Sequence, residues 1–206
     1  MWQLVFAIVS SLWVAPVNAV MTSEEVFALA SRSVVTVVTL NREQQPVGLG
    51  SGVVIRSERV VTNCHVLAGG QAVTVFYQER KFAGRVVDSM VGRDLCLLDV
   101  AGLNAPGLEI GNSKELRVGQ HVFALGAPHG LSLIFTEGLI SSLRADTELK
   151  LIQTSAPISP GSSGGALLTS DGRLIGITTL QHATGQNLNF AVPADWARQF
   201  RSLQGR

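Results

Sequence analysis

The sequence predicts an all-β protein built from two six-stranded antiparallel β-barrels, with a short helix near each end. Short segments rich in Val, Thr and Phe recur along the chain with turn residues between them, as in barrels and sandwiches. A connection that contains Pro and two glycines, Leu103–Gly111, divides these segments into two sets of six. Because no helical segments alternate with the strands, a βαβ arrangement is excluded, and two barrels side by side are the simplest architecture.

The expected strands lie on either side of that connection. The first set is Ser33–Leu40, Val47–Ile55, Arg59–Thr62, Ala72–Tyr77, Phe82–Val87 and Leu95–Val100. The second set is His121–Leu125, Leu131–Arg144, Glu148–Gln153, Ala166–Thr169, Leu174–Leu180 and Leu188–Val192. We therefore expect barrel one over about residues 33–102 and barrel two over about residues 112–193.

The two helices are expected outside the barrels. Thr22 and Glu25 have the spacing of a capping box and predict a short helix that runs to about Ser31. Pro193 precedes an amphipathic segment, Ala194–Leu203, which predicts the second helix.

The first 19 residues are typical of an export signal. Leu4–Val17 is mostly apolar but short for a bilayer span, and Val17-Asn18-Ala19 offers small residues for cleavage. An uncleaved membrane anchor is the alternative, because no Lys or Arg precedes the apolar run. We expect cleavage after Ala19, a periplasmic or secreted location, and no stable membrane insertion of the mature chain.

Composition argues against several classes of partner. Charged residues make up only 15% of the chain and the net charge is +1, so no basic surface for nucleic acid is expected. His121, His129 and His182 are scattered, whereas a metal site needs three or four converging ligands. We therefore expect no nucleic-acid partner, no metal and no cofactor.

A serine flanked by glycines is the candidate nucleophile. In Gly161-Ser162-Ser163-Gly164-Gly165, the glycines would let main-chain N–H groups converge on one point. A nucleophilic serine needs such donors, because the attacked carbonyl oxygen becomes negative in the transition state. Taken alone, the segment is equally compatible with an ordinary Gly/Ser turn between two strands.

A histidine and an aspartate lie at the ends of predicted strands earlier in the chain. His65 follows a Val-rich strand, and Asp94 precedes an apolar one. With Ser163 they supply the three parts of a nucleophilic triad. Ser163 would attack, His65 would take its proton and return it, and Asp94 would orient and stabilise the charged imidazole. An imidazole suits this role because it titrates near neutral pH.

The motifs around these residues resemble those of chymotrypsin-fold serine endopeptidases, most of all the HtrA/DegP-type proteases. The family's VTNNHV is VTNCHV here, its DLAVL-like segment is DLCLL, and its INPGNSGGPL loop is ISPGSSGGAL. LEIGNSKELRVGQHVFALGAPHGL resembles the entry into the family's second barrel, and NLNFAVP resembles its GIGFAIP. The resemblance spans about Ser33–Phe200 and implies one protease domain over residues 20–206.

A second hydrolase fold uses a similar serine motif. Residues 161–165 also fit G-x-S-x-G, the nucleophile elbow of α/β-hydrolases. That fold places its acid and histidine after the serine and requires a helix after the turn. Here the only later histidine is His182, and Ala166–Thr169 is a predicted strand. The order His65, Asp94, Ser163 therefore favours the chymotrypsin-type arrangement.

The resemblance implies further roles in the site. The N–H groups of Gly161 and Ser163 would form the oxyanion hole. The strand end Thr179-Leu180-Gln181 would pair with the backbone of an extended polypeptide substrate. The residues expected to line the primary specificity pocket are Ile158, Gln181 and Leu188. None of these three is acidic, so a small or medium aliphatic substrate side chain is expected rather than Lys or Arg.

Two departures from related enzymes carry expectations of their own. Digestive and clotting relatives have Asp where Ser162 stands, and that Asp pairs with a new N-terminal ammonium after zymogen cleavage. A serine cannot form this ion pair, so we expect activity without trimming beyond the signal. Most HtrA-type chains continue into a PDZ domain, whereas this one stops at Arg206, so control through such a module is not expected.

The chain has two cysteines, Cys64 and Cys96. An even number in an exported protein is compatible with a disulfide, and an assembled triad would bring the two backbones close together. Two buried free thiols are the alternative, since free cysteines are often buried.

Three hypotheses of function follow. The first is an exported serine endopeptidase that acts on unfolded or extended polypeptides. The second is a catalytically silent peptide-binding module on the same fold. The third is a resting enzyme whose oxyanion loop becomes ordered only when a substrate or partner binds. The presence of His65, Asp94 and Ser163 together favours the first, and the sequence leaves the oligomeric state open.

Overall fold

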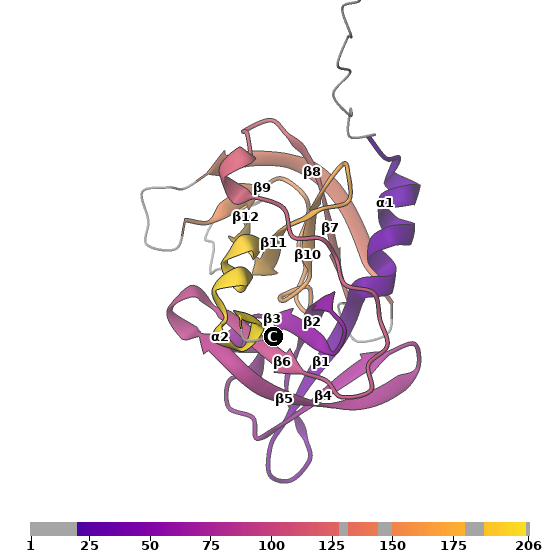
Figure 1. Ribbon diagram of the computed structural model, residues 1–206, viewed down its shortest axis with the longest axis vertical. Coiled ribbons are helices and arrows are strands. Elements are labelled where there is room, and N and C mark those ends of the chain that lie inside the picture. The colour runs from indigo at the N-terminus through magenta and orange to yellow at the C-terminus, as the bar shows by residue number, and fades with distance from the viewer. Residues whose placement is uncertain (1–19, 128–131, 144–149, 180–187, 205–206) are drawn as a thin grey trace, which may run out of the picture.

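Two closed six-stranded antiparallel barrels make up the protein, as the sequence predicts (Figure 1). The computed structural model describes residues 20–127, 132–143, 150–179 and 188–204, so the predicted signal segment lies outside the described residues. Barrel one comprises β1 (Val34–Leu40), β2 (Pro46–Arg56), β3 (Arg59–Thr62), β4 (Ala72–Tyr77), β5 (Arg80–Met90) and β6 (Leu95–Asp99). Barrel two comprises β7 (His121–Gly126), β8 (Ile134–Leu143), β9 (Ile152–Thr154), β10 (Ala166–Thr169), β11 (Leu174–Thr179) and β12 (Asn189–Pro193).

Both barrels have the same strand order. In barrel one the neighbours run β1-β2-β3-β6-β5-β4, and in barrel two the order is β7-β8-β9-β12-β11-β10. In each barrel the third and sixth strands pair, which places the loops at their ends side by side. Each barrel closes on itself, so it has no long unpaired strand edge.

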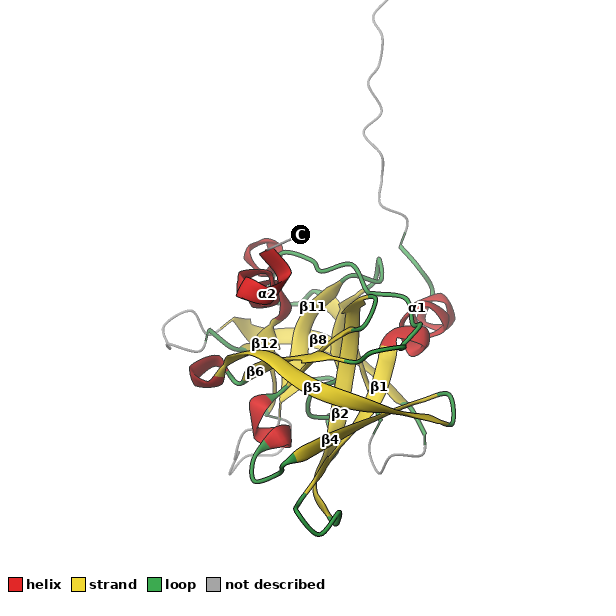
Figure 2. Ribbon diagram, turned by 60° about the horizontal axis from the view of Figure 1, so that its bottom comes forward, coloured by secondary structure: helices red, strands yellow, loops and turns green. Residues whose placement is uncertain are grey.

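Short helices lie at the periphery of the barrels (Figure 2). α1 (Ser23–Ala30) begins with the predicted capping box between Thr22 and Glu25, and its Phe27 ring packs edge-on against Phe135 of β8. Short 3₁₀ turns join other elements of the described chain: η1 (Ser31–Ser33), η2 (Cys64–Leu67), η3 (Val91–Arg93) and η4 (Ser113–Glu115). Among the described residues, no helix is both long and apolar enough to cross a membrane.

The C-terminal helix differs in form from the continuous helix that the sequence predicts. A 3₁₀ helix, η6 (Ala194–Gln199), is followed by a single α-turn, α2 (Arg201–Gln204). Phe200 leaves the helical conformation with ψ of 124° and its side chain is buried, while its N–H donates to the carbonyl of Ala197. Burial of this ring in the core therefore interrupts the helix.

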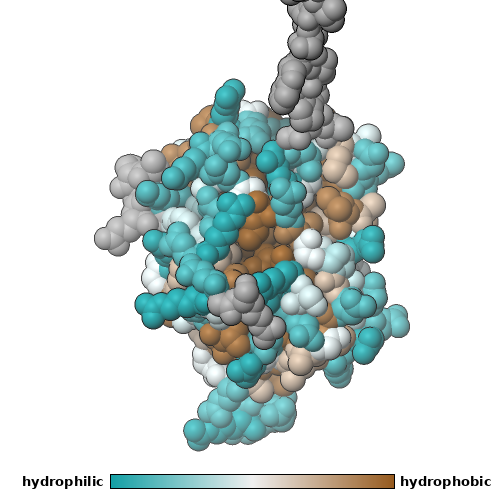
Figure 3. All heavy atoms as spheres, viewed as in Figure 1, coloured by the Kyte–Doolittle hydropathy of each residue, from teal (hydrophilic) through white to brown (hydrophobic). Residues whose placement is uncertain are grey.

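Three apolar clusters stabilise the fold. One fills barrel one and a second fills barrel two. The third joins both barrels to the two terminal helices, with Val26, Leu95, Phe123, Ile177 and Phe200 among its buried members. Burial of apolar surface is the main favourable term in folding, so this shared cluster fixes one barrel against the other. On the face shown in Figure 3, apolar side chains gather near the middle and polar ones surround them.

Candidate active site

The predicted histidine and aspartate meet at the ends of two paired strands. β3 and β6 pair from Arg59 opposite Asp99 to Thr62 opposite Cys96, so the turns η2 and η3 come together. His65 Nδ1 lies 2.7 Å from Asp94 Oδ2, and the His65 main-chain N–H donates to Oδ1 at 2.9 Å. This double contact fixes both the position and the ring orientation of the histidine.

Asp94 is held by donors from both barrels. The Thr179 hydroxyl, at the end of β11, donates to Oδ2 at 3.2 Å. In barrel one, the Asn63 side-chain amide donates to the Asp94 main-chain carbonyl at 2.9 Å. Asp94 itself has a left-handed backbone, with φ of 54°, a conformation that Asp tolerates better than most residues. The carboxylate therefore sits where the two barrels meet.

A disulfide joins the segments that carry His65 and Asp94. It links Cys64, the residue before the histidine, to Cys96, two residues after the aspartate, with their Cα atoms 5.0 Å apart. The bond reinforces the hydrogen bonds that the Cys64 and His65 N–H groups donate to Asp94, and it ties the same two segments covalently.

The Gly/Ser segment forms two consecutive tight turns. Ser162 N–H donates to the Ser159 carbonyl at 3.0 Å, and Gly165 N–H donates to the Ser162 carbonyl at 2.9 Å. The third residue of each turn is a glycine with φ of 89°, Gly161 and Gly164. A positive φ at this position defines a type II turn and strongly favours glycine, which explains the spacing of the two glycines.

Ser163 lies within the second of these turns and is only 4% exposed. Among the described residues, the N–H groups of Gly161 and Ser163 have no acceptor. Within the described part of the chain, the loop that carries the serine thus has two N–H groups without an acceptor, two residues apart in the sequence.

The serine loop and the segment that carries His65 both pack against Gly50 of β2. A Cβ added to Gly50 in β2 would lie 2.7 Å from the Val66 side chain and 2.8 Å from the Ser163 carbonyl, so both neighbours touch this bare Cα. Within the described residues, no hydrogen bond joins the Ser163 hydroxyl to the His65 ring. The structure therefore forms the His65–Asp94 contact and places the Ser163 backbone and the residue after His65 against the same glycine of β2.

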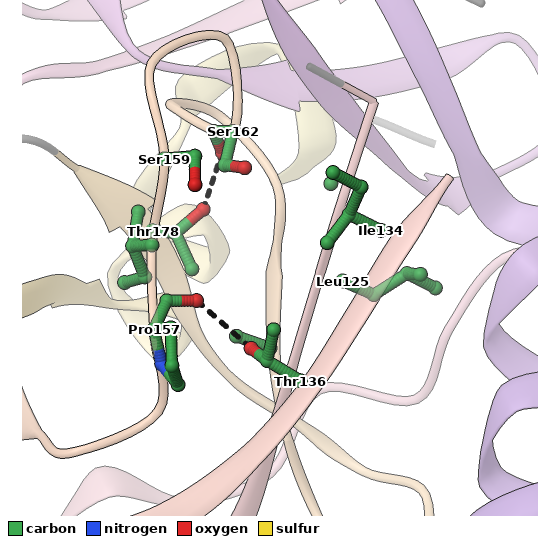
Figure 4. Close-up of a pocket in the computed structure, with 10 residues that line it drawn as sticks. Leu125, Ile134, Thr136, Pro157, Ser159, Ser162 and Thr178 are labelled. Carbon is green, nitrogen blue, oxygen red and sulfur yellow. Dashed lines mark hydrogen bonds between the residues drawn. The ribbon is translucent and has the colours of Figure 1, made fainter. Parts of the chain in front are cut away.

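A small cavity lies behind Ser162. Its volume is about 10 Å³, and Ser162, Thr178, Pro157 and Thr136 line it. Figure 4 shows the Thr178 hydroxyl bonded to the Ser162 carbonyl, at 2.6 Å, and the Thr136 hydroxyl bonded to the Pro157 carbonyl, at 2.8 Å. The space holds about one water molecule, and the loop above it is held by these neutral hydrogen bonds.

The predicted substrate-binding residues are described only in part. Leu180 and Gln181 lie outside the described residues. Thr179 ends β11, with its hydroxyl bonded to Asp94. Ile158 packs against the cluster inside barrel two, whereas Leu188 packs against the cluster between the barrels.

The remaining histidines have ordinary surroundings where they are described. His121 Nε2 lies 3.7 Å from Glu137 Oε2, and its ring packs edge-on against Phe123. His129 and His182 lie outside the described residues. In the described ranges, no group of three or more His, Cys, Asp or Glu side chains could hold a metal ion.

Two residues of the site were not singled out from the sequence. Asn63 supports Asp94, and Ser51, a fully buried serine of β2, contacts the nucleophile loop. Ser51 stands between two glycines in an otherwise apolar strand, which was the one available signal. The Asn63 contact has no such signal.

This arrangement, two antiparallel barrels with a His–Asp pair and a serine loop at their junction, is that of a chymotrypsin-fold hydrolase. A family model for the trypsin-like peptidase domain matches residues 50–177. The chain therefore belongs to the trypsin-like peptidases, and it is of the HtrA/DegP type according to its relatives.

Curated relatives are about one third identical in sequence to this chain over the matched region. A putative serine protease HhoB of Synechocystis is 36% identical over 168 residues, which is 77% of this chain and 40% of that protein. A probable periplasmic serine endoprotease DegP-like of Pseudomonas putida is 35% identical over 166 residues, 76% of this chain and 35% of that protein. The chain thus spans about two fifths or less of these relatives, over their protease region.

Solved structures agree with this assignment. The HtrA-type protease AlgW with tripeptide superposes with a TM-score of 0.77 at 32% identity, covering 86% of this chain and 62% of that one. The serine endoprotease from Yersinia pestis gives a TM-score of 0.76 at 31% identity, covering 87% of this chain and 65% of that one.

Proposed function

We propose that this chain is a serine endopeptidase that hydrolyses peptide bonds of unfolded or extended polypeptides through an acyl-enzyme. The observation that carries the proposal is the contact of His65 with Asp94 beside the buried loop of Ser163. A peptidase of this fold needs these three groups together. Family membership supports the same chemistry.

In the proposed acylation step the three side chains act together. Because Asp94 occupies His65 Nδ1, the other ring nitrogen, Nε2, is the one available to take a proton. Ser163 Oγ attacks the scissile carbonyl carbon while His65 accepts its proton, and Asp94 stabilises the resulting imidazolium. The imidazolium then gives this proton to the leaving amine as the peptide C–N bond breaks. Water, activated by the same histidine, hydrolyses the acyl-enzyme and regenerates the serine.

The oxyanion would be held by the N–H groups of Gly161 and Ser163. Both lack an acceptor among the described residues, which supports this role. Donors that are already oriented stabilise the charge that develops in the transition state without a cost of reorganisation. The two type II turns supply that orientation, because each fixes the backbone around one of the two donors.

An extended polypeptide fits the remaining features. The strand end Thr179-Leu180-Gln181 would pair with the substrate backbone, and Ile158, Gln181 and Leu188 would line the pocket for an aliphatic side chain. The related AlgW structure contains a tripeptide, in keeping with such a substrate. Mass-spectrometric mapping of cleaved bonds in a denatured protein should find small or medium aliphatic residues before the cut. Cleavage mainly after Lys or Arg would overturn this preference.

Activity would require no zymogen cleavage. The cavity behind Ser162 holds about one water and is lined without an acidic side chain, so it offers no site for an N-terminal ammonium. An exported location, periplasmic or secreted, accords with the apolar leader, with the Cys64–Cys96 disulfide and with the name of the Pseudomonas relative.

A fluorophosphonate probe separates the three hypotheses of function. An active peptidase is labelled at once, and mass spectrometry of the digested adduct places the label on Ser163. A resting enzyme is labelled only when a peptide is present, and a silent binding module is never labelled. The Ser163→Ala variant is the control for non-specific labelling. An unlabelled wild type that is folded by circular dichroism would refute the proposed activity.

A further inference from the structure

Ser51 is a buried polar residue that reaches from barrel one into barrel two. It lies in β2 and is fully inaccessible to solvent. Its hydroxyl donates to the Gly161 carbonyl at 2.9 Å and accepts from the Ala127 N–H, at the end of β7, at 2.8 Å. Both partners belong to barrel two, so both of these side-chain hydrogen bonds join Ser51 to the neighbouring barrel.

The backbone of Ser51 contacts the same loop. Its N–H donates to the Ser163 carbonyl at 2.7 Å, and its carbonyl accepts from the Thr62 hydroxyl at 2.7 Å. Gly161 and Ser163, the two residues proposed to supply the oxyanion-hole donors, therefore both have their carbonyl oxygens bonded to Ser51. Its hydroxyl holds the first and its amide holds the second.

The carbonyl between them is also fixed. Ser162 O accepts from the Thr178 hydroxyl at 2.6 Å and from the Gly165 N–H at 2.9 Å. Because a peptide group is planar, a fixed Ser162 carbonyl also sets the direction of the Ser163 N–H. Three successive carbonyls of the loop thus point to protein donors, and the N–H groups of Gly161 and Ser163 are left free.

The two ends of this loop differ in what holds them. Around Ser163 the backbone is fixed by hydrogen bonds from Ser51 N–H, Thr178 and Gly165. The Gly161 carbonyl has a donor only in the Ser51 hydroxyl, among the described residues. Glycine has the widest choice of backbone angles, so this end of the loop has the least intrinsic stiffness. Without the hydroxyl, only the turn bond from Ser162 N–H to the Ser159 carbonyl would, in the described part of the chain, hold the peptide that follows Gly161, so Gly161 would be the residue of the loop most free to move.

We infer that Ser51 is a positioning residue for the oxyanion hole: its hydroxyl holds Gly161 in the conformation in which that residue's N–H can stabilise the oxyanion. The inference rests on the proposed function, since it assigns Ser51 to the transition state of that reaction. It does not touch the substrate, and it acts through the peptide that follows Gly161.

The test compares Ser51→Ala with the wild type in steady-state peptide hydrolysis and in inhibition by a peptide aldehyde. A peptide aldehyde adds to the serine and places an oxyanion in the hole, so its inhibition constant reports on the hole itself. We expect kcat/KM to fall by about ten- to a hundredfold, below the effect of deleting a donor of the hole outright. The inhibition constant of the aldehyde should rise by a similar factor, while KM changes little.

A matched control removes a buried hydroxyl elsewhere. Thr169 is 6% exposed, lies at the end of β10 away from the nucleophile loop, and bonds to Asp171 and the Arg173 backbone. Thr169→Val should lower the stability to urea without changing kcat/KM per active site. Ser51→Cys replaces the hydroxyl by a slightly larger thiol that is a weaker donor, and it should give an intermediate aldehyde affinity. This variant is measured if Ser51→Ala does not fold.

The outcomes are decisive in either direction. Active sites are counted by fluorophosphonate labelling, and kcat/KM is expressed per labelled site. A loss of kcat/KM accompanied by a similar loss of aldehyde affinity supports the positioning role of Ser51. An unchanged aldehyde affinity in Ser51→Ala or Ser51→Cys overturns it, as does a loss explained by fewer folded molecules. A folded wild type that neither hydrolyses peptides nor takes the label would instead defeat the proposed function, which separates the two failures.

Discussion

The Thr179 hydroxyl donates to Oδ2 of Asp94, the same carboxylate oxygen that contacts His65 Nδ1. Thr179 is buried at the end of β11 in barrel two, whereas the histidine and the aspartate belong to barrel one. The proposed catalytic pair is therefore completed across the junction of the barrels. Its geometry depends on how the barrels pack, as well as on the pairing of β3 with β6.

Thr179→Val should slow the chemical step. Valine keeps the shape of the side chain but removes a donor to the carboxylate, so Asp94 orients His65 less firmly. We expect kcat to fall by about tenfold with little change in KM, in line with the worth of a hydrogen bond to a charged group. Steady-state kinetics on a peptide substrate measure this. Thr179→Ser keeps the hydroxyl and should retain most activity; equal losses in both variants would show that the loss of the hydroxyl does not by itself explain the effect.

Removal of the Cys64–Cys96 disulfide should destabilise the fold. The bond joins residues 32 apart, and the chain-entropy account values such a loop at about 3–4 kcal/mol. The Cys64→Ser/Cys96→Ser double variant should lose about this much free energy of unfolding in urea. Reductant should destabilise the wild type and leave the double variant unchanged. Two free thiols in the denatured, unreduced wild type would contradict the bond.

Acid should weaken barrel one through Asp99. Hydrogen bonding from Arg85, together with the charge of Arg59, holds the pKa of Asp99 below its ordinary value in the folded state. The unfolded chain has an ordinary Asp pKa of about 3.9, so the stabilisation is fully present above that pH. It is lost as the pH falls through the lower, folded value.

The Asp99→Asn variant isolates this contribution. Urea unfolding at several pH values between 3 and 7 should show a constant deficit for the variant above about pH 5. The deficit should shrink below about pH 4, because the wild type then loses the same charge. A deficit that stays constant down to pH 3 would show that the carboxylate does not titrate in this range.

Much of the fold could be predicted because it is encoded locally. Segments rich in Val and Thr mark strands such as β1, and Thr22 with Glu25 marks the start of α1. The C-terminal helix was predicted as one piece because its sequence is amphipathic throughout. Its interruption at Phe200 depends on the cluster between the barrels, which the local pattern does not contain.

In the candidate site, too, only the locally encoded features could be predicted from the sequence. Gly161 and Gly164 indicate tight turns around Ser163 because positive φ angles leave a mark in the sequence. The local sequence does not indicate the hydrogen bond from Thr179 to Asp94 or the one from Ser51 to Gly161. Their partners lie 85 and 110 residues away, and only the packing of the two barrels brings them together.

The most direct test of the account is the Ser163→Ala variant in hydrolysis of casein and of a short peptide. Alanine removes one oxygen from a residue that is 4% exposed, so the circular dichroism spectrum and the urea midpoint should match the wild type closely. The account predicts that kcat/KM falls by at least about 10⁴-fold, as expected when a triad nucleophile is lost. Hydrolysis by Ser163→Ala within about tenfold of the wild-type rate would contradict the assignment of Ser163 as the nucleophile.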